Sequence, residues 1–101
     1  MVNIQRIEQQ IAAFIDEDLV PKMPKLEGIA LAAFAPVYIR AKLPGALKMA
    51  QSIGLAEGDN VDVDKVFAEF KGKAQGKWPI ELMGFTFYED DLDKLYRNIE
   101  R

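Results

Sequence analysis

The chain has 101 residues, half of them hydrophobic and 29% charged, a balance typical of a folded domain. It carries a net charge of −3 and contains neither cysteine nor histidine, which excludes disulfides, thiolate metal sites and histidine-based catalytic triads. We therefore expect one compact domain over residues 1–101 that is cytoplasmic, carries no cofactor and is not an enzyme.

The first predicted helix covers residues 4–19. Its large apolar residues recur at helical spacing and form one stripe: Ile4, Ile7, Ile11 and Phe14. Its last turn carries Asp16, Glu17 and Asp18, although a helix C-terminus favours cations. Two interpretations remain open. Either Lys22 and Lys25 fold back on these acids or the helix ends early, or the acids form a patch that binds a basic partner.

A second helix is predicted over residues 25–41, with Pro36 kinking it or dividing it in two. Residues 37–39 are apolar on more than one face, so we expect them to be deeply buried. A third helix is predicted over residues 44–53, because proline favours a first turn and Gly54 supplies a stop. Residues 56–60 are predicted to form a loop.

Helical spacing returns over residues 63–75, and residues 79–87 alternate as in a small β-hairpin that turns at Met83-Gly84. A last helix is predicted over about 89–100. The predicted fold is a helical bundle: mainly α, with about five helices around one core and a short β-hairpin before the C-terminal helix.

Two similar segments, DVDKVF (62–67) and DLDKLY (91–96), begin the last two predicted helices. Clustered carboxylates can bind calcium, but in both segments lysine stands where a calcium-binding EF-hand loop requires glycine. We interpret them as helix starts, with Asp62 capping the first and Asp91 and Asp93 in the first turn of the second. No metal site is predicted.

The segment KGKAQGKW contains the main basic cluster: Lys71, Lys73, Lys77 and Trp78. These residues could bind phosphate and stack a base. The alternative is a solvated helix end whose lysines complement the helix dipole while Trp78 covers the core.

The order of elements is that of a winged helix: helices 44–53 and 63–75, followed by hairpin 79–87. Our alternative prediction is therefore a winged-helix-like DNA-binding protein. However, the recognition helix would begin with Asp62 and Asp64, which would face phosphates. We therefore expect nucleic-acid binding to be unlikely, with no useful affinity at physiological salt.

The leading prediction is a non-catalytic interaction or structural module, a small soluble helical domain of bacterial type. Its apolar surplus suggests a protein partner or self-association as a homodimer, and no run is long enough to span a membrane. A carboxylate-based enzyme is the second alternative. The candidate partner-binding residues are those of the acidic and basic clusters: Asp16, Glu17, Asp18, Lys71, Lys73, Lys77 and Trp78.

Overall fold

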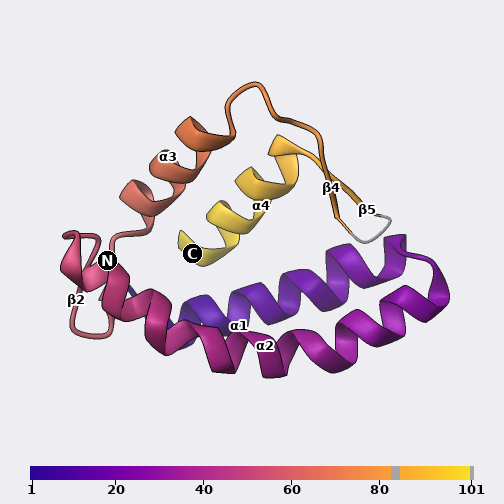
Figure 1. Ribbon diagram of the computed structural model, residues 1–101, viewed down its shortest axis with the longest axis horizontal. Helices are drawn as coiled ribbons and strands as arrows, with labels where there is room; N and C mark the ends of the chain where they lie inside the picture. Colours follow the sequence, from indigo (N-terminus) through magenta and orange to yellow (C-terminus); the bar gives the residue numbers. More distant parts are fainter. Residues whose placement is uncertain (83–84, 101) are drawn as a thin grey trace.

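The computed structural model describes residues 1–82 and 85–100, and this part of the chain is mainly α (Figure 1). Its four α-helices are α1 (Ile4–Phe14), α2 (Lys25–Ser52), α3 (Val63–Ala74) and α4 (Glu89–Glu100). In Figure 1, α1 and α2 lie side by side, and α4 packs against both α1 and α3. The predicted class is confirmed, with four α-helices in the described residues in place of about five.

The first helix begins where predicted, because the Asn3 side chain accepts a hydrogen bond of 2.8 Å from the Gln5 N–H. The predicted helix 4–19 is α-helical only to Phe14. It continues as a π-helical turn, η1 (Ile15–Leu19), and then as a 3₁₀ turn, η2 (Val20–Lys22). Pro21 lies at this change, and its ring would clash with a carbonyl of a regular α-turn.

The prediction of separate helices over 25–41 and 44–53 is wrong, because α2 is one continuous helix. Both Pro36 and Pro44 lie inside it, and both are exposed to solvent. A proline removes one backbone hydrogen bond from a helix. On the solvent side of a curved helix these hydrogen bonds are already lengthened, so the loss there is smaller. Figure 1 shows α2 curving around the rest of the molecule, which accommodates both rings without a break.

The end of α2 leads into a small sheet where a loop was expected. Gly54 has a φ of 79° and supplies the predicted left-handed stop, and the Leu55 N–H returns to the Ala50 carbonyl at 2.8 Å. Strands β2 (Ala56–Glu57) and β3 (Asn60–Val61) then pair antiparallel. Strand β1 (Val2–Asn3) adds to the other edge of β3, so the sheet ties the start of the chain to the α2–α3 connection.

The C-terminal half follows the prediction closely. Helix α3 ends one residue before the predicted boundary, and β4 (Ile80–Leu82) pairs antiparallel with β5 (Phe85–Phe87) as the predicted hairpin. The proposed turn at Met83-Gly84 lies outside the described residues. Helix α4 has the predicted bounds.

The two similar segments both start helices, but in different ways. The Asp62 carboxylate accepts a hydrogen bond of 3.2 Å from the Lys65 N–H and caps α3, as predicted. At α4 the Asp91 carboxylate reaches back to the Tyr88 N–H at 2.9 Å. Because α4 begins at Glu89, Asp93 lies in its second turn and not in the first.

The buried core is formed by side chains from α1, the small sheet, α3 and α4. These side chains are Ile7, Ala56, Val61, Val63 and Ile99. Ile99 is the most deeply buried of these, with 1% of its surface exposed. Helix α2 contributes only half-buried residues to this cluster, Leu47 and Ala50, both from its C-terminal half. The N-terminal half of α2 therefore lies outside the main core.

Candidate functional site

One of the three acidic residues of η1 forms an ion pair within the chain. Asp16 and Glu17 are exposed, whereas Asp18 pairs with Lys94 of α4. The α-helix does end early, at Phe14, as one interpretation had it, and Asp18 pairs with a lysine of α4 that neither interpretation named. The proposal of a patch for a basic partner stays a prediction. This ion pair joins η1 to α4, so the acidic cluster contributes at least one contact to the fold.

The basic cluster is also engaged. Lys71 pairs with Asp93 and lies 3.8 Å from Glu89, and its hydrogen bond to Asp93 raises the pKa of Lys71. Lys73 and Lys77 are exposed. Trp78 is half-buried, with its ring centroid 6.1 Å from that of Phe70 and 5.8 Å from that of Phe87.

These contacts bear on the predicted nucleic-acid interface. Two carboxylates surround Lys71, and Trp78 packs against the rings of Phe70 and Phe87. Arg40 of α2, which a basic stripe for DNA would also need, pairs instead with Glu8 of α1 at 3.8 Å. The helix 44–53 of the winged-helix alternative is the end of α2 and not a separate element.

A shallow groove of about 200 Å³ between α3 and α4 holds two carboxylates. Asp64 accepts a hydrogen bond from the Tyr96 hydroxyl, which raises the pKa of Tyr96 to about 12. The other carboxylate, Asp93, pairs with Lys71. Each acid thus faces a donor from the neighbouring helix, an arrangement that links α3 to α4. Within residues 1–82 and 85–100, no three carboxylates gather closely enough to hold a metal ion.

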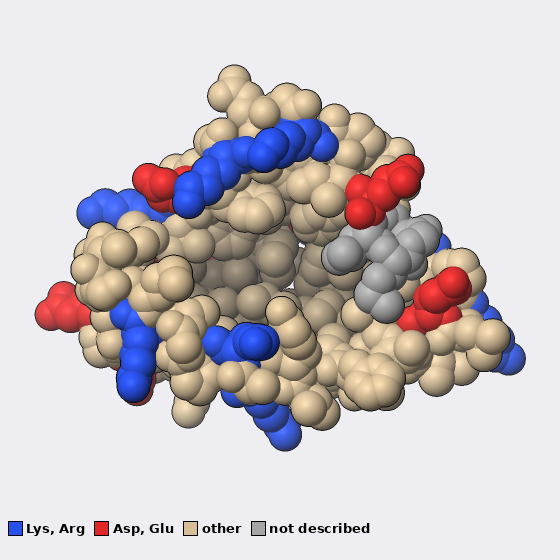
Figure 2. Space-filling model, in the orientation of Figure 1, with Lys and Arg blue, Asp and Glu red and all other residues tan. Residues whose placement is uncertain are grey.

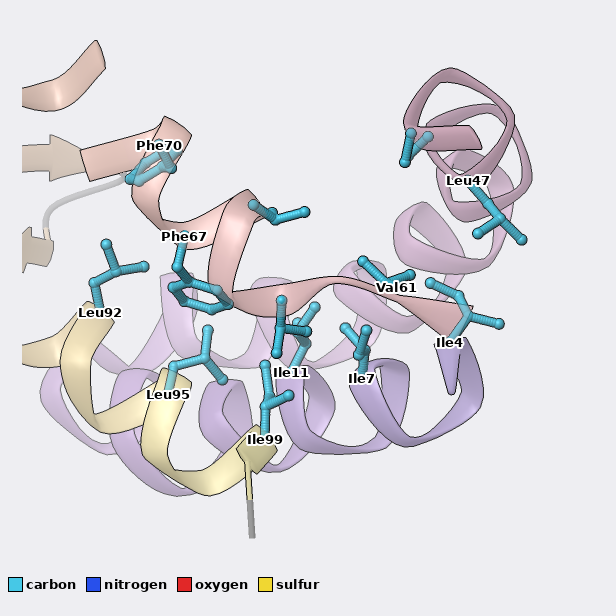
Figure 3. Close-up of a pocket in the computed structure, with 14 residues that line it drawn as sticks. Ile4, Ile7, Ile11, Leu47, Val61, Phe67, Phe70, Leu92, Leu95 and Ile99 are labelled. Atoms are coloured by element: carbon cyan, nitrogen blue, oxygen red, sulfur yellow. The ribbon is translucent and has the colours of Figure 1, made fainter. Parts of the chain in front are cut away.

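A larger cavity of about 300 Å³ opens between the helices (Figure 3). Its lining side chains are all apolar and come from every α-helix and from β3, including Ile11, Leu47, Phe67, Leu92 and Ile99. Figure 2 shows a hollow with uncharged walls in this region of the molecule. The cavity therefore offers contacts to apolar groups, and none of its lining side chains could orient a polar substrate.

The most exposed apolar surface lies on the N-terminal half of α2, on the side away from α1. We call it the outward face, and its large side chains are Leu26, Ile29, Phe34, Val37 and Tyr38. Leu26 is 82% exposed and Phe34 is 72% exposed. Residues 28–39 of this helix contain no charged side chain. In Figure 1 this half of α2 runs along the lower edge of the molecule.

The outward face corrects a prediction made from the sequence. Residues 37–39 were expected to be deeply buried, but Val37 is 66% exposed and Tyr38 is 64% exposed. The buried side of this half of α2 is formed by small residues, Gly28 and Ala35, which pack toward η2 and α1. At Gly28 an added Cβ would lie 3.2 Å from the Val20 carbonyl oxygen, so the chain approaches closely there.

The sequence signal for this face was present but ambiguous. A helical segment that is apolar all round is normally buried on all sides. This pattern predicted burial in the chain's own core, whereas the fold covers only one side of the segment. None of the helices in the described part of the chain is both long enough and apolar enough to cross a bilayer.

Comparisons of the chain with protein-family models, with curated proteins and with solved structures find no match.

Proposed function

We propose that this protein is a non-catalytic interaction module whose outward face binds a helix of another protein chain. The observation that carries this proposal is the uncharged run 28–39, of which one side packs on the chain's own elements and the other is open to solvent. The proposal places the module in the cytoplasm, the compartment that the cysteine-free sequence suggests.

The size of the face supports a protein partner. Its five large side chains together expose roughly 700 Å² in our estimate, about what one partner contributes to a standard protein interface. Monomeric proteins rarely leave such a continuous apolar patch uncovered, since each Å² of apolar surface removed from water contributes about 25 cal/mol.

The shape of the face supports a helix as the bound element. Between the large side chains lie small ones, including Ala30, Ala33 and Ala41, which let a second helix approach closely. The face from Leu26 to Ala41 is about 24 Å long by helical rise, enough for roughly four turns of a partner. A helix-on-helix contact of this kind uses the spacing that the sequence already has.

The test is site-specific photo-cross-linking of the full chain in cells of its source organism. A benzophenone side chain replaces Phe34, and a matched control carries it at Lys73, which is exposed on α3. We expect discrete higher-mass protein adducts from position 34 and none from position 73. Adding Val37→Glu to the position 34 chain should abolish the adducts. Absent adducts at position 34, or equal adducts at both positions, would refute the proposal.

A further inference from the structure

We infer that the helix bound by the outward face is α2 of a second copy of this chain, packed antiparallel about a two-fold axis near Phe34. This inference rests on the proposed function and names the partner. It follows from the position of two opposite charges at the ends of the face.

The two charges lie on the same flank of α2. Phe34 and Tyr38 are about one helical turn apart and mark this flank. Glu27 lies about two turns before Phe34, and Lys42 about one turn after Tyr38. The position of Lys42 is supported by a contact, since its Nζ lies over the Tyr38 ring at 5.9 Å from the centroid.

Antiparallel pairing brings these charges together twice. In a two-fold pair of antiparallel helices, the same flank of both helices faces the same side of the interface. Glu27 of each copy then lies beside Lys42 of the other, provided that the axis passes midway between them, at Phe34 and Ala35. In a two-fold parallel pair the same flanks face opposite sides of the interface, so neither Glu27 would lie beside a Lys42 and the charge pairing would be lost.

The same register satisfies the apolar residues. With the axis at Phe34, the two Phe34 rings meet midway along the interface, on the flank that carries both charges. On the other flank Arg40 has Glu8 of its own chain at 3.8 Å, so its charge is already balanced. The aromatic contact is therefore compatible with this register, and the charges favour it over parallel pairing.

The area is adequate for a dimer. The outward face exposes roughly 700 Å² per copy, so a dimer could bury at most about 1,400 Å², which lies within the range of stable, specific interfaces. Because a two-fold contact uses the same patch on both chains, it closes at two copies and leaves no further apolar face of α2 for a third.

The experiment is sedimentation equilibrium of the purified full chain over a micromolar concentration series. We expect the wild type to have twice the chain mass of 11.4 kDa. Phe34→Glu should sediment as a monomer with an unchanged far-ultraviolet circular dichroism spectrum. Val37→Glu serves as a second disrupting variant should Phe34→Glu fail to fold.

Charge exchange then tests the register. Glu27→Lys and Lys42→Glu should each weaken dimerisation about tenfold at low salt, because each acts at two symmetric contacts. The double variant Glu27→Lys/Lys42→Glu should recover wild-type affinity to within about twofold. Lys73→Glu, the matched charge reversal on α3, should have no effect.

The outcomes separate this inference from the proposed function. A wild type that stays monomeric, or a dimer that survives both Phe34→Glu and Val37→Glu, overturns the second copy as partner. If position 34 still gives adducts with another protein in cells, the proposed function stands. A dimer that is lost in Phe34→Glu but not restored by the charge exchange overturns the antiparallel register.

Discussion

At the scale of single residues, the starts of the helices follow local hydrogen-bonding rules. Asp62 was predicted to cap α3 and does so through the Lys65 N–H. At α4 the acid that reaches back is Asp91, three residues after the capped Tyr88 N–H. Local chemistry thus explains why the two similar segments both begin helices, and their different registers show that the likeness lies in helix-start chemistry.

We predict that Asp62→Ala lowers the free energy of unfolding by about 1 kcal/mol, the usual cost of a lost N-cap. Glu69→Ala, on an exposed position inside the same helix, should change it by less than about 0.5 kcal/mol. Urea denaturation of the three proteins measures both effects. Equal effects of the two substitutions would contradict a capping role for Asp62.

Tyr96 gives a prediction about alkaline pH. Its hydroxyl donates to Asp64, and this hydrogen bond raises the pKa of Tyr96 from 10.0 to about 12. The folded form thus holds the phenol proton more tightly than the unfolded form. Its contribution to stability is complete below pH 10 and is lost as the pH rises through about 12.

We expect an ultraviolet titration of the wild type to contain one late phenolate step that is absent in Tyr96→Phe. The control Tyr88→Phe removes an exposed tyrosine and should retain the late step. Asp64→Asn should move that step back toward the ordinary tyrosine pKa. A wild type in which all tyrosines ionise together would contradict the hydrogen bond.

At the scale of elements, α2 is the helix in which the structure differs most from the sequence-based prediction. Two prolines predicted separate helices, yet both lie on the solvent side of one continuous curved helix. Helix propensity is a weak local preference that tertiary packing overrides. In the first half of α2, small residues pack against η2 and α1. In the second half, Leu47 and Ala50 pack against the core.

We predict that Pro36→Ala raises the free energy of unfolding, by up to about 3 kcal/mol, because it restores one helical hydrogen bond and replaces proline by the residue with the highest helix propensity. The increase should appear in urea denaturation followed by circular dichroism. Pro24→Ala, at the position before α2 begins, restores no bond within the helix and should give a smaller change. Destabilisation by Pro36→Ala would mean that the curve of α2 depends on the proline.

At the scale of the whole molecule, the helices surround an open hollow that their side chains do not fill. The radius of gyration of 13.9 Å exceeds the roughly 13 Å typical of this chain length, in keeping with the cavity between the helices. Interiors are normally close-packed, so the cavity lowers the stability that the core could supply.

Filling this space should stabilise the fold. Ala50 lines the cavity from α2, and Ala50→Leu should raise the free energy of unfolding by about 0.5–2 kcal/mol. Lys48→Leu, on the exposed side of the same helix, adds apolar surface without filling the cavity and should lack this gain. Urea denaturation compares them. A loss of stability in Ala50→Leu would indicate that the cavity walls already meet in solution.

The charged clusters illustrate what sequence reasoning could and could not say about a site. It found the candidate residues Asp18, Lys71 and Trp78, and their chemistry suggested partners. It did not find that Asp93 and Lys94, adjacent on α4, are the partners of Lys71 and Asp18. These pairs join residues far apart in the chain, and only the packing of α4 brings them together.

The sequence by itself determined the helical class, the starts of α1, α3 and α4, the end of α2 at Gly54 and the hairpin before α4. Each of these depends on capping, backbone conformation or side-chain periodicity within a few residues. The tertiary structure alone decided that α2 is continuous and that Val37 and Tyr38 face solvent while Ile39 is half-buried. A run that is apolar on every side has no periodic difference to select its buried face, so that choice depends on which other elements pack against it.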